Sequence, residues 1–528
     1  MKKALIIVFS VFFAIVLVYG INNYFQTESF FSYILDDAYI HLAIAKNFAL
    51  YGNWGITKYV FSSTSSSPLF TLILSALISV FGDFHLIPFW FNLLLFVIII
   101  VFLVKHFSRY FSSQKLVIFS ILFALFSSVL YVQIFSGMEH ILQVLVLVVN
   151  IFYFQKWIDS NYHDEDSRFW FFFTITIMGL IRFESMFYLT AVIFVFLLLK
   201  KFKKSAAVLL VGFLPIVAFC FYNYQNTGYL FPFSVVVKGS QFSFQDDFSE
   251  QLYRFVFNNF LLNRAFYKIG FFPLVIFLAF FIKDFKLKGI RYALENNLAA
   301  LVISITMVFH TFFADLKGFF RYESYLMVGF AMTLLPRLVD YIKDNFFQKL
   351  KKLDVVCWSS IFIILITIYK IGFSHIMLWY GGKNIYEQQI QSAKFLEKYY
   401  RNSKIVANDI GAICYFTEIQ LFDIVGLGSQ VTVPYNENNR PRDLEFGGFV
   451  KNYTEKNNYE VAIIYDNWLK PYIPSTWKKV AKLQITHNWS CAYDHVFVYA
   501  VDSKDYNKII GHIKNFTWNK NVKVEIVR

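Results

Sequence analysis

The stretch that decides the fold is FSYILDDAYIHLAIAKNFALYGNW, residues 31–54, in which two adjacent acids, Asp36 and Asp37, follow a long apolar segment. Another apolar segment begins a short distance downstream. Carboxylates are costly in or beside a lipid bilayer, so acids found there favour a function or a specific partner. The remaining sequence predicts which side of a membrane these two acids face.

The composition is that of a membrane protein. Of the 528 residues, 57% are hydrophobic and 16% are charged, against about 25% charged in soluble proteins. The N-terminal run MKKALIIVFSVFFAIVLVYG has no convincing small-residue cleavage site, so we expect an uncleaved first span. The net charge of +14 comes from Lys and Arg clustered between apolar runs, which is a topology signal rather than a nucleic-acid-binding signature.

The apolar runs predict a polytopic helical membrane protein with about eleven transmembrane helices. Segment 68–82 is too short to cross a hydrocarbon core of about 30 Å, so we expect a juxtamembrane or re-entrant helix there. The predicted spans are 4–20, 86–104, 116–135, 139–157, 168–183, 185–199, 205–222, 269–282, 297–313, 322–336 and 354–372.

The distribution of Lys and Arg supports that assignment. With 68–82 not crossing, five basic loops share the side of the N-terminal Lys residues, which the positive-inside rule places in the cytoplasm. Asp36, Asp37 and the region beyond residue 380 then face the extracytoplasmic side. A crossing at 68–82 would reverse the side of every later loop. The basic loops are 105–115, 156–167, 200–204, 284–291 and 337–353.

Residues 380–528 predict an extracytoplasmic α/β domain that follows a transmembrane domain of residues 1–379. A helix is expected at 385–401, and four strand-like runs follow, separated by turns rich in Asn, Pro and Gly. Cys414 and Cys491 lie in this region and would be able to form a disulfide in an oxidising compartment. The strand-like runs are 404–409, 421–427, 460–467 and 496–502.

The paired acids have two readings. Asp37 begins a predicted helix with Ile40, Ile44 and Phe48 at a spacing of four, which suits a helix lying on the membrane face. A carboxylate at its start would cap the helix. One acid is enough for a cap, however, and a pair can hold one carboxylate as a general base or as a group that orients a phosphate.

Glu139 stands where a predicted span begins, in SGMEHILQ, and a structural role at a helix N-terminus is one explanation for it. Together with Asp36 or Asp37 it would offer oxygen ligands to a divalent metal, which is the one cofactor that the sequence suggests. The neighbouring His140 is expected to be a structural hydrogen-bonding residue rather than a metal ligand.

Several cations and one further acid lie on the predicted outer side. Arg182 and Glu184 are separated from two spans by almost no loop, and a mutual ion pair is the simple explanation. Lys238, Arg321 and Tyr322 lie near the outer membrane face, where snorkelling is the alternative to a function. Outward acids together with outward Lys and Arg suit an anionic lipid headgroup, since Arg binds phosphate with two donors.

Segments in this order resemble those of the C-type glycosyltransferases, the GT-C superfamily. They are similar to the bacterial branch that includes lipid A aminoarabinose transferases, protein O-mannosyltransferases and mycobacterial arabinofuranosyltransferases. Phe183 stands where that branch has Pro, and no Pro follows Tyr322 at the expected place. The segments are DDAYIHLAIAKNFALYGNWGI, FSSTSSSPLFTLILSALISVFG, SGMEHILQVLVLV, GLIRFESMFYL, NTGYLFPFSVVVKGS, FFRYESYLMVG and IVANDIGAICYFTEIQLFDIVGLGS.

The resemblance implies an inverting transfer of a sugar from a polyprenyl-phosphate donor to a hydroxyl of a cell-envelope glycan, lipid or protein. The catalytic base would be an acid of the first outer loop, with Asp36 favoured by position and Asp37 as its partner. Glu139 would match the acid of the second loop, which positions acceptor or phosphate. Lys238 and Arg321 would match cations that bind the donor phosphate.

The resemblance also implies that 68–82 is a juxtamembrane helix, in agreement with the charge distribution. It marks His41, just after the paired acids, as a further candidate, and it leaves Arg182, Glu184 and Tyr322 as candidate substrate-binding residues. The protein would sit in the inner (plasma) membrane.

Two other functions share this hydropathy. A transporter or lipid flippase would place ionisable groups near mid-bilayer and show internal repeats, and neither is seen here. A glycan polymerase or ligase would also use outward Arg and a long outer loop. The paired acids directly after the first span favour the transferase.

Overall fold

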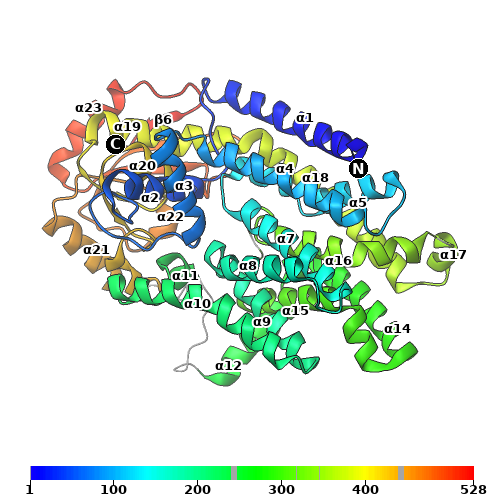
Figure 1. The fold of residues 1–528 in the computed structure, drawn as a ribbon. Helices are drawn as coiled ribbons and strands as arrows, with labels where there is room; N and C mark the ends of the chain where they lie inside the picture. Colours follow the sequence, from blue (N-terminus) through cyan, green and yellow to red (C-terminus); the bar gives the residue numbers. More distant parts are fainter. Residues whose placement is uncertain are drawn as a thin grey trace.

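The computed structural model describes residues 2–238, 247–314, 316, 318–343, 345–437 and 445–527. Up to Ile385 these residues form helices and the loops between them (Figure 1). The helices are α1 (Lys2–Gln26), α2 (Asp37–Tyr51), α3 (Pro68–Phe81), α4 (Ile87–Phe107), α5 (Gln114–Ser127), η1 (Leu130–Val132), α6 (Gln133–Ser136), α7 (His140–Asp159), α8 (Glu165–Ile181), α9 (Ser185–Leu198), α10 (Phe202–Thr227), α11 (Phe233–Lys238), α12 (Phe248–Tyr253), η2 (Arg254–Leu261), α13 (Arg264–Ile269), α14 (Phe271–Asn296), α15 (Leu298–Phe313), α16 (Ser324–Ile342), α17 (Phe346–Lys351) and α18 (Val355–Ile385).

Every predicted span overlaps a helix, but the number of crossings stays a prediction. By length and composition, 6 helices of the described chain can cross a membrane, or up to 8 if each bent pair is one span. The apolar helices α9 and α15 have only 14 and 16 residues, so they are shorter than a usual crossing.

Two predicted boundaries are wrong. Segment 116–135 is not one straight span, because α5 ends at Ser127 and the chain bends by 59° before η1 and α6. Val129, at this break, has left-handed backbone angles (φ 52°), which do not continue a right-handed helix. The predicted loop 284–291 is instead helical within α14, with a kink at Gly289, whose φ of 82° favours glycine.

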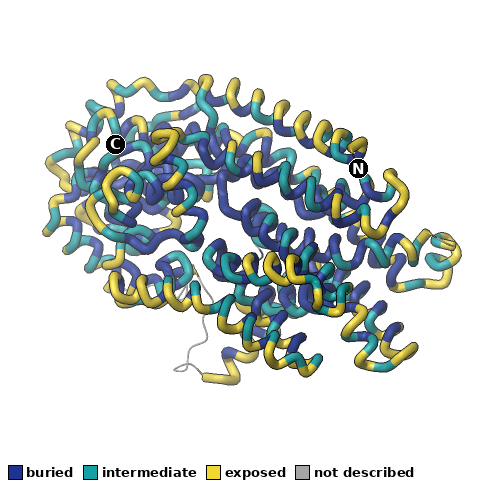
Figure 2. Tube along the Cα trace, viewed as in Figure 1, coloured by how far each residue is buried: buried dark blue, intermediate teal, exposed yellow. Residues whose placement is uncertain are grey.

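Helix α1 has one buried apolar face and one exposed apolar face. Ala4, Val8, Phe12 and Val16 lie at a spacing of four on α1 and are buried, while the other face of the same apolar helix is exposed (Figure 2). Ile6 is 65% exposed. A helix that is apolar on both its buried and its exposed side fits a lipid-facing position.

The molecule is elongated, and its basic N-terminus and its C-terminal region lie at opposite ends (Figure 1). The N-terminus and α17 lie at one end of Figure 1, and the C-terminal region lies at the other, beside α2 and α3. The short helix α3 packs against α2 at that same end. The basic N-terminus and the basic segment around α17 therefore share an end, as the charge distribution predicts.

The C-terminal region is an α/β unit around a six-stranded sheet, in the order β2-β1-β3-β5-β4-β6. Strand β1 pairs in parallel with β2 and β3, and the other pairings are antiparallel. The elements are η3 (Tyr386–Ile390), α19 (Gln391–Tyr400), β1 (Lys404–Ala407), α20 (Gly411–Phe416), β2 (Gln420–Asp423), η4 (Gln430–Tyr435), α21 (Glu445–Lys456), β3 (Val461–Ile464), α22 (Asp466–Leu469), β4 (Lys478–Gln484), β5 (His495–Ala500), η6 (Ser503–Asp505), α23 (Tyr506–Asn515) and β6 (Lys523–Ile526).

The four strand-like runs of the sequence correspond to β1, β2, β3 and β5. Strands β4 and β6 were not predicted, because KKVAKLQ and KVEI carry charges that weaken an apolar strand signal. The predicted helix 385–401 continues α18 without a break, and the helical segment runs from Val355 to Tyr400. Cys414 and Cys491 are free thiols and form no disulfide.

Candidate active site

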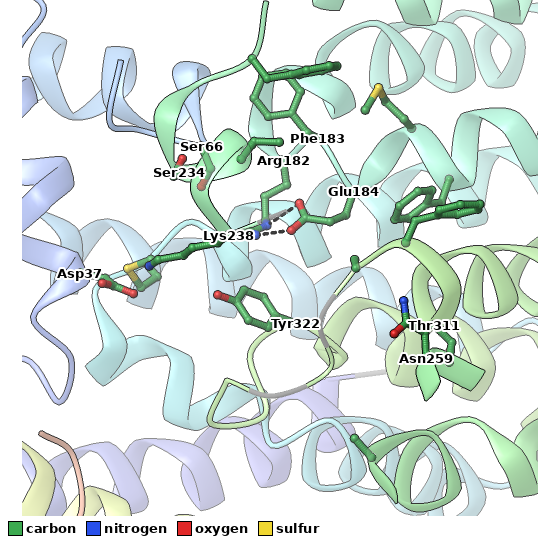
Figure 3. A pocket seen from close by; sticks show the side chains of 18 of the residues that line it. Asp37, Ser66, Arg182, Phe183, Glu184, Ser234, Lys238, Asn259, Thr311 and Tyr322 are labelled. Atoms are coloured by element: carbon green, nitrogen blue, oxygen red, sulfur yellow. Dashed lines mark hydrogen bonds and ion pairs between the residues drawn. The ribbon is translucent and has the colours of Figure 1, made fainter. Parts of the chain in front are cut away.

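A cavity of about 790 Å³ lies among α2, α9, α11, α13 and the loops that precede α9 and α16. Charged groups gather in one part of it, and Figure 3 shows Asp37, Lys238, Arg182 and Tyr322 grouped there. Thr311 lies on the opposite side of the same cavity. Much of the remaining lining is apolar: Met186, Phe187, Phe231, Leu262 and Phe313.

Asp37 is the predicted acid that reaches this cavity. It is the first residue of α2, and its carboxylate accepts a hydrogen bond of 2.8 Å from Nη1 of Arg321. Burial pushes the pKa of Asp37 upward, but the positive charges of Arg321 and Lys238 outweigh it and lower the pKa to about 2. The Lys238 side chain extends toward Asp37 (Figure 3). Asp37 is therefore ionised and flanked by cations.

Asp36 points elsewhere. It is 6% exposed, and its two oxygens accept hydrogen bonds from the backbone N–H groups of Gly411 (2.6 Å) and Ala412 (2.8 Å) at the start of α20. Asp36 is not among the residues that line the cavity. Its side chain joins the loop between α1 and α2 to the C-terminal region.

A buried ion network supports the charged part of the cavity. Arg182 donates to Glu139 and makes two hydrogen bonds with Glu184, one of them 3.0 Å long from its Nε. The other side of Glu139 faces Nε2 of His41 at 3.2 Å. The network links the starts of α7 and α9 with α2, so the short loop around Arg182 has a structural reason as well as a place in the cavity.

Tyr322 packs against the guanidinium groups of both Arg182 and Arg321. The guanidinium groups of Arg182 and Arg321 lie over its ring at 5.1 and 5.0 Å from the centroid. His140 packs on the same ring at 5.6 Å, but its buried ring nitrogens have no hydrogen-bond partner among the described residues, so the predicted hydrogen-bonding role is not seen. Tyr322 lines the cavity, so both guanidinium groups are held beside a lining residue.

Hydroxyl groups form another part of the lining. Thr64, Ser65 and Ser66 belong to the loop before α3, and Ser234 belongs to α11. Ser65 lies 3.2 Å from Nδ1 of His41, so the loop is held to the ion network. Ser66 and Ser234 lie beside one another in Figure 3.

The metal site suggested by the sequence is not assembled. Asp36, Asp37 and Glu139 each hold other partners, and in the described ranges no three His, Cys, Asp or Glu side chains are grouped to hold a metal ion.

The structure thus brings Asp37, Arg182, Glu184, Lys238 and Tyr322 together at the cavity. Arg321 acts on it through Asp37, and Glu139 through Arg182. Sequence reasoning missed the partners of Asp36, which are Asp409, Gly411 and Ala412. The signal was an acid and a glycine at the end of a strand in IVANDIGA.

Comparisons with known proteins place this fold. A sequence family described as a domain of unknown function (DUF8728) matches residues 383–499. No curated protein matches the chain. The structure is similar to that of ArnT from Cupriavidus metallidurans bound to undecaprenyl phosphate, with 12% identity, a TM-score of 0.53, and coverage of 94% of this chain and 98% of ArnT.

The structure is also similar to the Archaeoglobus fulgidus oligosaccharyltransferase in its apo form. Identity is 11% and the TM-score is 0.51, with coverage of 99% of this chain and 75% of that one. At these identities the likeness shows a shared fold, so the chain has an ArnT-like fold.

Proposed function

We propose that this protein is a GT-C-type membrane glycosyltransferase that moves a sugar from a polyprenyl-phosphate donor to a hydroxyl of a cell-envelope glycan, lipid or protein. Transfer takes place on the outer face of the inner (plasma) membrane and inverts the anomeric carbon. The observation that carries the proposal is that Asp37 and Lys238 line one partly apolar cavity, with Arg321 hydrogen-bonded to Asp37. The ArnT fold, known with undecaprenyl phosphate bound, supports the same kind of donor.

The donor phosphate is assigned to Lys238 and Arg321. Lys238 lies at the cavity beside Asp37, and Arg321 already holds one anion there, the Asp37 carboxylate. Phosphate esters are bound by Lys and Arg through charge-assisted hydrogen bonds. The apolar lining, with Phe187, Leu262 and Phe313, suits the first isoprene units of the lipid.

Asp37 is assigned as the general base. The acceptor oxygen attacks the anomeric carbon, the bond from that carbon to the phosphate oxygen breaks, and Asp37 takes the hydroxyl proton. The phosphate leaves with the bonding electron pair and is stabilised by Lys238 and Arg321. When the phosphate draws Arg321 and Lys238 toward itself, Asp37 loses part of the positive field that lowers its pKa. Donor binding thereby makes Asp37 a stronger base.

Sequence position alone favours Asp36 as the base, and the geometry supports Asp37 instead. Both oxygens of Asp36 accept backbone hydrogen bonds, and Asp36 does not line the cavity. Asp36 is therefore assigned a supporting role.

The orientation rests on charge. The N-terminus and α17, both basic, lie at the end opposite the C-terminal region (Figure 1). The positive-inside rule then supports a cytoplasmic location for that basic end and an extracytoplasmic one for residues beyond 380.

Asp37→Asn tests the proposal. Membranes of a strain that lacks this protein supply both the unused donor and the unmodified acceptor, so purified enzyme is added to them and sugar transfer is followed by mass spectrometry. Loss of a general base lowers rates about 10²–10⁴-fold, and we expect a fall in that range. The matched control is Asp159→Asn, at the far end of α7 and 62% exposed, which keeps the normal rate.

Wild-type transfer rates in Asp37→Asn would contradict the assignment of the base. A wild-type protein that carries the lipid-linked sugar across vesicle membranes but joins it to no acceptor would favour the flippase alternative.

A further inference from the structure

The matched domain of unknown function contacts the first outer loop at several residues, among them Ile34, Asp36 and Lys58. The Asp36 carboxylate accepts hydrogen bonds from the backbone N–H groups of Gly411 and Ala412, and both donors lie inside the matched residues 383–499. The next residue in the chain, Asp37, faces the cavity. Two neighbouring acids therefore face different sides, one held by the C-terminal region and the other available to the substrate.

Gly411 is required for this contact. A Cβ atom at that position would lie 2.1 Å from the backbone oxygen of Asp36 and 2.6 Å from its Oδ2. Both distances are far inside van der Waals contact, and one of the opposed atoms is backbone. Any side chain at 411 would push the first outer loop away from α20.

Asp409 completes the contact. Its carboxyl group lies near that of Asp36, and burial together with the Asp36 charge raises the pKa of Asp409. Two buried carboxyl groups so close together favour holding one proton between them. Asp409 is held in turn by Nε2 of Gln389 at 2.7 Å, and Oη of Tyr465 lies 3.1 Å from the same carboxyl oxygen.

Other titratable groups lie near the two carboxyls. Among the described residues they include Asp37 and Tyr39 on α2, Cys414 on α20, Tyr465 after β3, and Cys491 on the loop between β4 and β5. The carboxyl pair is held from three elements of the C-terminal region, so its position is fixed from that side.

We infer that the domain matched at residues 383–499 is a brace for the base: Asp409, Gly411 and Ala412 fix Asp36 and thereby aim Asp37 at the acceptor. Asp409 and Gly411 are positioning residues, and they touch neither donor nor acceptor. The inference rests on the proposed function, because it needs Asp37 to act as the base. It gives the domain a role in the rate of transfer rather than in donor binding.

Gly411→Ala is the first test, and Gly448→Ala on α21 is its control, since a Cβ at 448 meets nothing within 4 Å. Two readouts are needed: the rate of sugar transfer in the membrane assay above, and the binding of undecaprenyl phosphate to the purified protein. Because misplacing a reacting group by about 1 Å costs about 100-fold, we expect Gly411→Ala to lose about that factor in rate. Its Kd for undecaprenyl phosphate stays within about 2-fold of wild type, and Gly448→Ala keeps both values.

A pair of variants at Asp409 tests the same inference if Gly411→Ala does not fold. Asp409→Asn offers an amide N–H to Asp36 in place of the shared proton, and we expect it to keep the rate within about 3-fold. Asp409→Leu has a similar volume and no donor, and it should lose rate as Gly411→Ala does. This rescue by Asn would not be expected of a residue that only fills space.

Three outcomes would contradict the inference that the domain positions Asp36 and Asp37. They are a wild-type rate in Gly411→Ala, equal rates in Asp409→Asn and Asp409→Leu, and loss of undecaprenyl phosphate binding in step with the rate. Failure of the proposed function is seen separately, as wild-type transfer by Asp37→Asn or as no binding of undecaprenyl phosphate by the wild-type protein.

Discussion

Arg182 shows how much one side chain does at this site. Its guanidinium pairs with Glu139 and Glu184 from two different helix starts and lies over the ring of Tyr322. The three partners belong to segments that are far apart in the sequence. A single planar group with five donors serves both acids, which a Lys ammonium would not do with the same geometry.

Replacing Arg182 by Gln should destabilise the protein strongly. Glu139 is fully buried and would lose its cationic partner, and breaking a buried ion pair from one side costs about 3–5 kcal/mol. The measurement is thermal unfolding of the purified protein in detergent. Arg168→Gln is the control, because the Arg168–Glu165 pair is 52% and 78% exposed and contributes little. Equal unfolding temperatures for the two variants would contradict the role given to the network.

At the scale of residues, the sequence predicts which charges matter but not how they pair. Asp37, Lys238 and Tyr322 were expected at one site and line one cavity. Asp36 and Asp37 are adjacent, and nothing in their spacing tells which of them faces the substrate. That depends on the backbone N–H groups of Gly411 and Ala412, which lie about 375 residues away in the chain.

At the scale of elements, α20 connects the sheet domain to the loop between α1 and α2. Burial raises the pKa of Asp36 and of Asp409, against the backbone hydrogen bonds that favour the Asp36 carboxylate. A carboxyl group with a raised pKa holds a proton in the folded protein that the unfolded chain has already released. Linkage then makes the free energy of unfolding fall as pH rises above about 4, the unfolded value, until both groups have ionised.

Asp409→Asn removes one of the two carboxyls and should flatten this dependence. We expect the unfolding temperature of the wild-type protein to fall from pH 5 to pH 8 by more than that of Asp409→Asn. Unfolding scans in detergent across this range measure it, with Asp340→Asn, 69% exposed on its side chain, as the control. Identical slopes in the wild type and Asp409→Asn would contradict a shared buried proton.

The apolar runs predict most helices, because lipid-facing and core-facing sides are both apolar and give strong signals. They do not predict breaks inside a run. The bend after Ser127 coincides with left-handed backbone at Val129, whose φ is 52°, and the kink at Gly289 coincides with a φ of 82°. Strand β4 was missed because Lys478, Lys479 and Lys482 interrupt its apolar pattern.

At the scale of the whole molecule, the cavity lies where the helical part meets the sheet domain. Helix α2 contributes to both, since Asp37 and Ile40 line the cavity and Asp36 before it contacts α20. Under the proposed function, this position gives the lipid access from the helical side and the polar acceptor access from the other side. The total number of crossings does not change this arrangement, which depends on α2, α9, α11 and α13.

The central claim is that Lys238 and Arg321 hold a phosphate carried by a lipid. The direct measurement is equilibrium binding of undecaprenyl phosphate to the purified protein, comparing wild type with Lys238→Ala and with Lys286→Ala on the exposed side of α14. Loss of one charge-assisted hydrogen bond, about 1.5–3 kcal/mol, corresponds to at least about 10-fold in Kd. The account predicts that loss in Lys238→Ala and none in Lys286→Ala, and equal Kd values for the two variants would contradict it.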